Sequence, residues 1–128
     1  MATVRSHIRI ACDPDAVYAL VADSGKLGEW FPGIESIAID GKLRTVTLPD
    51  GATVVEEIVT DDPQLRRFQY RIAEGMPLEH HLSTIDVIAD GSGALVVYGA
   101  DVRPDEIGPA MAPALEAAVA GLKTRLES

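Results

Sequence analysis

Glu56 is the residue of this sequence with the clearest capacity for chemistry. In the alternating segment 53–60 it shares a face with Val54 and Ile58, while its neighbour Glu57 falls on the other face. A carboxyl group that faces an apolar interior has a raised pKa unless a cation or a hydrogen-bond donor meets it. Glu56 is therefore a candidate proton acceptor, or an anchor for a ligand hydroxyl. Two alternatives stay open: a register shift of one residue that exchanges Glu56 with Glu57, and a rim position paired with an arginine.

The second candidate for acid–base work is one member of the pair His80-His81. Adjacent residues of a strand point to opposite faces, and alternation with Ser83 and Ile85 selects His81 as the inward one. Its imidazole suits proton transfer near neutral pH, although a core or rim position also explains a single inward histidine. Opposite orientation makes the pair poor metal ligands, and the only other histidine is His7, so we expect no metal and no cofactor.

The same alternation gives a larger inward-facing set, most of it apolar, in which five members carry a polar atom. The five are Glu56, Tyr70, His81, Ser83 and Tyr98. A mostly apolar enclosure with a few polar groups is typical of a small-molecule site. Tyr70 and Tyr98 can present hydroxyls to a ligand while their rings pack, and core packing with an incidental hydrogen bond is the alternative.

Other candidate ligand contacts are large apolar residues. Trp30 and Phe31 form the main aromatic cluster of a chain that is only 5% aromatic, and either border a cavity or plug the junction between short helices and the sheet. Met76, in a Gly-Met-Pro segment, is an adaptable residue for a loop over a cavity mouth. Met111 and Leu115 lie on the apolar face of a helix, where they would shape a ligand or simply pack.

These residues require a sheet and one long helix to position them. Strand patterns occupy 3–11, 34–40, 42–48, 53–60, 67–73, 78–89 and 94–103, with a short helix after Asp13 and a helical turn at 26–30 following the first. Tight turns between strands make the sheet antiparallel. At 107–126 a bulky apolar stripe predicts a long C-terminal helix that must lie on that sheet. Pro113 predicts either a bend near 110–114 or a helix that begins there.

Composition restricts the classes of partner. The chain has 128 residues, which suits one domain, and a net charge of −9 from 11 basic and 20 acidic residues. Nucleic acids and anionic membrane surfaces require a basic face, so we expect neither as a partner. Cys12 is the single cysteine, which leaves no disulfide framework. With no signal-peptide pattern and no apolar run long enough to span a bilayer, we expect a cytoplasmic protein without stable membrane insertion.

The order of elements and several strings resemble the START-like superfamily, also known as SRPBCC, helix-grip or polyketide cyclase/dehydrase-like proteins. The strings are EWFPGI at 29–34, GATVVEE at 51–57 with Asp62-Pro63, STIDV at 83–87 and GLK at 121–123. The resemblance covers 1–128 as a single domain. It implies an α+β fold: a seven-stranded curved antiparallel sheet wrapped around the long C-terminal helix, with two short helices after the first strand and an internal cavity near Trp30 and Phe31.

Three functions follow from this resemblance and from the residues. The first is binding or transport of a small hydrophobic ligand, lipid or polyketide-like, in a cavity between sheet and helix. The second is a cyclase or dehydratase that uses Glu56 or His81 as acid and base. The third is a non-catalytic regulatory or interaction module with a filled core, and a homodimer is left open. We favour the first, because no established catalytic set is visible in the sequence.

Overall fold

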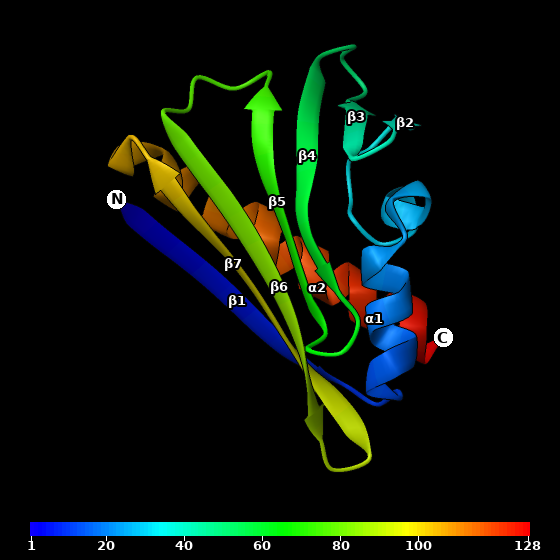
Figure 1. Ribbon diagram of the computed structural model, residues 1–128. Coiled ribbons are helices and arrows are strands. Elements are labelled where there is room, and N and C mark those ends of the chain that lie inside the picture. The colour runs from blue at the N-terminus through cyan, green and yellow to red at the C-terminus, as the bar shows by residue number, and fades with distance from the viewer.

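A computed structural model describes residues 1–128. Its seven strands form one antiparallel sheet in the order β1-β7-β6-β5-β4-β3-β2. The strands are β1 (Ala2–Ile10), β2 (Ser36–Asp40), β3 (Leu43–Thr47), β4 (Thr53–Asp62), β5 (Arg67–Glu74), β6 (His80–Asp90) and β7 (Gly93–Arg103). Figure 1 shows this sheet lying across one side of the long helix α2 (Gly108–Glu127). The predicted sheet and C-terminal helix are confirmed.

Local signals account for the ends of most elements. Helix α1 (Pro14–Ala22) begins where the Asp13 carboxylate accepts hydrogen bonds from the Asp15 and Ala16 amides at 2.8 and 3.4 Å. The β2–β3 and β6–β7 hairpins close through two-residue loops that each start with a glycine at φ +60°. Residues with a Cβ atom rarely adopt a positive φ, so Gly41 and Gly91 favour these two turns and help to fix the register of both hairpins.

The structure corrects the end of one strand and refines two predictions about helices. The helical turn expected at 26–30 is a 3₁₀ helix, η1 (Ser24–Glu29), and a further 3₁₀ turn, η2 (Asp105–Ile107), precedes α2. The strand expected to stop at Thr60 continues to Asp62, because Asp61 and Asp62 pair with β5. Helix α2 begins at Gly108 and continues through Pro113, so the alternative of a helix that begins at 110–114 is excluded, and a bend there stays a prediction. Pro109 lies in the first turn, where the amide has no partner in the helix, whereas Pro113 removes one backbone hydrogen bond.

The core is solid along the second half of α2. There the buried side chains of Ala118, Val119 and Leu122 join the buried residues of α1 and of the strands. Trp30, at the end of η1, is part of the same core, and its ring packs near those of Phe31 and Tyr98. The second half of α2, helix α1 and Trp30 therefore share one hydrophobic core with the sheet.

Gly121 sets how closely α2 approaches that junction. A Cβ atom at this position would overlap the backbone carbonyl oxygen of Trp30. Helix propensity alone predicts that Gly121→Ala stabilises the protein by about 1 kcal/mol. We expect the opposite, a loss of about 2 kcal/mol, because the overlap is with backbone that cannot rotate away. Chemical denaturation measures the change, and Ala120→Gly on the exposed side of the same turn is the control for propensity. A more stable Gly121→Ala variant would contradict this prediction.

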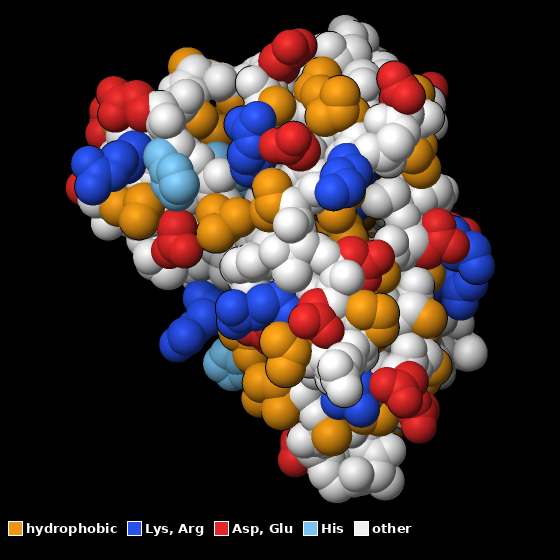
Figure 2. All heavy atoms as spheres, viewed as in Figure 1, with side chains coloured by type: hydrophobic (Ala, Val, Ile, Leu, Met, Phe, Trp, Pro, Cys, Tyr) orange, Lys and Arg blue, Asp and Glu red, His pale blue; other side chains and the backbone are white.

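The outer face of the sheet carries acidic and basic side chains interspersed with apolar ones (Figure 2). Several of these charges are paired across strands, among them Arg67 with Asp86 and Arg71 with Glu57. Exposed pairs of this kind contribute little to stability, at most about 1 kcal/mol each. No helix in the structure is both long enough and apolar enough to cross a lipid bilayer.

Candidate functional site

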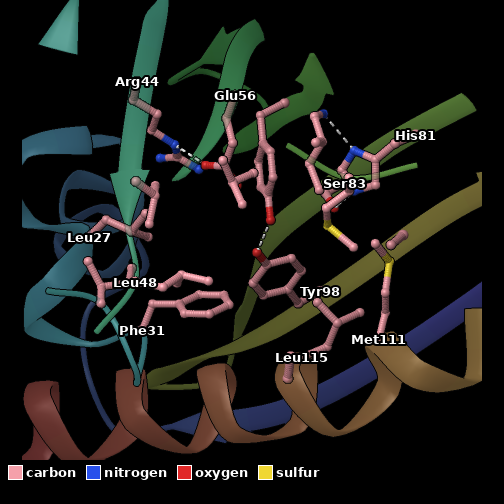
Figure 3. Close-up of a pocket in the computed structure, with 18 of the residues that line it drawn as sticks. Leu27, Phe31, Arg44, Leu48, Glu56, His81, Ser83, Tyr98, Met111 and Leu115 are labelled. Atoms are coloured by element: carbon pink, nitrogen blue, oxygen red, sulfur yellow. Dashed lines mark hydrogen bonds and ion pairs between the residues drawn. The ribbon is translucent and has the colours of Figure 1, made fainter. Parts of the chain in front are cut away.

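A pocket of about 300 Å³ lies between the sheet and the first half of α2. Figure 3 shows side chains from η1 and from strands of the sheet converging on it, with Met111 and Leu115 entering from the helix. Nineteen residues line it, and fifteen of them are hydrophobic: Leu27, Phe31, Ile34, Arg44, Val46, Leu48, Val54, Glu56, Tyr70, Ile72, Met76, His81, Ser83, Tyr98, Ala100, Ala110, Met111, Ala114 and Leu115. The volume is at the low end of the range for small-molecule sites.

A buried ion pair stands at one end of the pocket. Nε of Arg44 donates to Oε1 of Glu56 at 2.6 Å, and the two side chains are only 2% and 12% exposed. The guanidinium also donates from Nη1 to Ser24 at 3.3 Å and lies over the ring of Tyr70, 4.7 Å from its centroid. The ion pair, the hydrogen bond to Ser24 and the contact with the Tyr70 ring together restrict the orientation of the guanidinium.

Strand pairing explains why these two residues meet. Arg44 of β3 and Glu56 of β4 are direct cross-strand partners. On its other side β4 has a register shift against β5 between Val55 and Glu56. Despite this shift Glu56 keeps the face of Val54, since both line the pocket. Glu56 faces inward as predicted. It is also paired with an arginine, so two features that the sequence analysis gave as alternatives occur together.

Burial raises the pKa of Glu56, and the charge and hydrogen bond of Arg44 oppose this increase. The direction follows from the low polarity of the pocket, which disfavours an isolated carboxylate. Arg44 supplies the compensating charge that allows Glu56 to lie inside at all.

The hydroxyl groups of Tyr70 and Tyr98 hydrogen-bond to each other in the middle of the pocket. Burial raises the pKa of Tyr70 to about 12 and the pKa of Tyr98 well above its usual value, and the charge of Glu56 acts in the same direction. Both tyrosines are therefore neutral at physiological pH. They can offer hydroxyl donors and acceptors to a ligand, but not a phenolate.

His81 is buried with both ring nitrogens engaged. Nδ1 accepts a hydrogen bond from the Ile72 amide at 2.9 Å, so the neutral ring carries its proton on Nε2, which lies 2.9 Å from the Ser83 hydroxyl. Burial, with His80 adding to it, lowers the pKa of His81 to about 4, and Asp101 opposes the shift. The imidazole bridges β5 and β6, whose backbone pairing covers Tyr70 and Ser83 but does not extend to Ile72.

Eight of the nine predicted ligand contacts line the pocket. They are Phe31, Glu56, Tyr70, Met76, His81, Tyr98, Met111 and Leu115. Trp30 does not line it: the side chain is 4% exposed, lies in the adjoining core, and leaves its Nε1 without a hydrogen-bond partner. Of the two alternatives for this aromatic pair, Trp30 therefore fills the junction between the short helices and the sheet, and Phe31 borders the cavity. Whether the eight bind a ligand stays a prediction.

Arg44 is the one charged residue of the pocket that the sequence analysis did not name. The available signal was alternation in the segment 42–48, which places Arg44 on the same face as Val46 and Leu48. No group of three or more histidine, cysteine, aspartate or glutamate side chains in the structure is arranged to hold a metal ion.

Comparisons with known proteins agree with this architecture. The structure of the protein XoxI from Bacillus cereus matches with a TM-score of 0.89 and 25% identity, over 100% of this chain and 97% of that one. Truncated norcoclaurine synthase from Thalictrum flavum matches with a TM-score of 0.78 and 18% identity, over 98% and 94% of the two chains. The di-domain ARO/CYC BexL from the BE-7585A biosynthetic pathway matches with 0.83 and 19%, over 99% of this chain and 47% of that one.

The last two likenesses, at under 25% identity, concern the fold alone. No curated protein matches the sequence. A family model described as "Polyketide cyclase / dehydrase and lipid transport" matches residues 1–127, nearly the whole chain. This protein therefore belongs to the polyketide cyclase/dehydrase and lipid transport family.

Proposed function

We propose that this protein binds a small, mostly apolar molecule with an oxygen-bearing end in the pocket between the sheet and α2. The observation that carries the proposal is the composition of that pocket: fifteen of nineteen lining residues are hydrophobic, and a buried ion pair is concentrated at one end. Apolar walls favour burial of a hydrocarbon skeleton, and a small number of polar groups is enough to fix the orientation of the ligand. At about 30 Å³ per water-sized group, the volume suits a ligand of roughly ten non-hydrogen atoms.

The geometry supports binding better than catalysis. A general base needs a free lone pair near the substrate, and both nitrogens of His81 are already engaged. Oε1 of Glu56 accepts from Arg44, whose positive charge opposes the increase in pKa that burial causes, so the carboxylate is held as one member of an ion pair. A filled core is the third alternative, and the pocket itself argues against it.

Titration calorimetry with 2-naphthol and octan-1-ol tests the proposal. Both are neutral, largely apolar and close to the expected size. We expect at least one to bind, with a negative heat-capacity change that reflects burial of apolar surface. Extraction of the purified protein followed by mass spectrometry would then identify the natural ligand.

Ala100→Leu provides the matched variant for this experiment. Ala100 is 2% exposed and lines the pocket from β7, so a leucine there occupies space that a ligand would use. We expect the affinity for the bound probe to fall at least about tenfold, which is about 1.4 kcal/mol. Ala120→Leu, on the exposed side of α2, should leave affinity unchanged. Equal affinities in wild type and Ala100→Leu would place the probes elsewhere and contradict the proposal.

A further inference from the structure

We propose that Glu56 determines the charge specificity of the pocket. With Glu56 paired to Arg44, the pocket selects uncharged molecules that carry a hydrogen-bond donor beside an acceptor, such as carboxamides or hydroxyketones. It rejects carboxylates built on the same skeleton. This inference rests on the proposed binding function and specifies the chemical class of its ligand.

The charges of the residues that line the pocket cancel. Arg44 is its only cation and Glu56 its only anion, and their side chains meet inside the pocket. The remaining titratable residues there, Tyr70, Tyr98 and His81, are neutral at physiological pH. An ionic ligand therefore enters a site with no net charge to compensate it.

The ion pair leaves one polar atom of each partner free. The Arg44 hydrogen bonds use Nε and Nη1, and the Glu56 hydrogen bond uses Oε1. Nη2 of Arg44 and Oε2 of Glu56 have no protein partner. Nε1 of Trp30 is the one fully buried side-chain polar atom without a hydrogen-bond partner, so Nη2 and Oε2 are each partly accessible. Both residues line the pocket, so we infer that a ligand there meets one free donor and one free acceptor.

A carboxamide and a carboxylate differ in how they can use these two atoms. A carboxamide accepts from Nη2 through its carbonyl and donates to Oε2 through its amide N–H, so both free atoms are satisfied. A carboxylate of the same shape can use Nη2 but brings a second anion against Glu56. It also loses its hydration in an apolar pocket. Repulsion by Glu56 offsets attraction by Arg44, and the lost hydration is uncompensated.

Octanamide and octanoate test this directly, because they have the same skeleton and differ only at the polar end. Calorimetry is carried out at about pH 8, where carboxyl groups favour the ionised form. We expect wild type to bind octanamide at least about tenfold more tightly than octanoate. In Glu56→Gln the guanidinium lacks its anion, and the preference should reverse in favour of octanoate. Glu57→Gln, which changes the adjacent carboxylate on the outer face, should keep the wild-type preference.

The outcomes separate the inference from the proposed function. If both probes bind wild type with affinities within about twofold, or if Glu56→Gln keeps the preference for octanamide, the charge specificity is refuted while binding stands. If neither probe nor the neutral alcohols bind any variant, the binding function fails as well. Should Glu56→Gln fold poorly, thermal denaturation replaces calorimetry. Octanoate, which supplies the missing carboxylate, should then restabilise the variant and octanamide should not, and the reverse would overturn the inference.

Discussion

Replacing Arg44 with methionine is expected to lower the free energy of unfolding by about 3–5 kcal/mol, because Glu56 then stays buried without a cation. The Arg44 side chain is 2% exposed, and its ion pair with Glu56 lies inside the pocket. Glu56→Leu should cost a similar amount by leaving the guanidinium unpaired. The double variant should recover most of either loss, because two apolar side chains of similar volume need no compensating charge. Urea denaturation of the four proteins measures the coupling between the two positions.

The exposed pair formed by Arg71 of β5 and Glu57 of β4 is the matched control. Its double-mutant cycle should give a coupling below about 1 kcal/mol, as is usual for solvated pairs. The pH dependence adds a second check. Without Arg44, the pKa of Glu56 should rise further above that of the unfolded chain, so the Arg44→Met variant should lose less stability as pH falls. Equal couplings in the two pairs would contradict the interior position of Glu56.

Acidification is expected to remove about 2–3 kcal/mol of stability through His81 alone. Burial lowers its folded-state pKa to about 4, while the unfolded chain has the ordinary value near 6.5. The unfolded state therefore binds more protons between these two values. The stabilising contribution is complete above about pH 6.5 and is lost as pH falls toward about 4. Protonation would also remove the acceptor that Nδ1 presents to the Ile72 amide.

The measurement is the free energy of unfolding at about pH 7.5 and about pH 4.5, taken for wild type and for His81→Gln. Other groups titrate over the same interval, but subtracting the variant's pH dependence cancels their contribution. His7→Gln, at an exposed position of β1, should retain the wild-type pH dependence. If His81→Gln loses as much stability on acidification as wild type, the imidazole is not held neutral by burial.

The fold could be predicted because its signals are local. Alternation along each strand and glycine in the hairpin loops need only a few consecutive residues. Prediction failed where a contact with a residue distant in the sequence decides the end of an element. Asp61, Asp62 and Pro63 have the composition of a turn, yet β4 continues through both aspartates because β5 pairs with them and Asp61 accepts a 2.7 Å hydrogen bond from the Tyr18 hydroxyl.

In the candidate site, too, the features set by local sequence could be predicted and those set by distant contacts could not. The inward orientation of Glu56 and His81 follows from a period of two within their own strands. The partner of Glu56 does not, because Arg44 lies opposite it only through the β3–β4 register. Trp30 stands at the C-terminal end of η1, outside any regular period, so no repeat indicated that Phe31 rather than Trp30 would reach the pocket.

The contrast between the two halves of α2 has a consequence for evolution. Its second half is sealed into the core around Trp30 and Gly121, whereas Ala110, Met111 and Ala114 border open space. Mutations of the pocket-lining residues in the first half can therefore change the shape of the pocket while the fold persists, whereas mutations of buried residues in the second half destabilise the core. If the proposed binding function holds, new specificities can arise on this scaffold by changes within a few residues of Pro113.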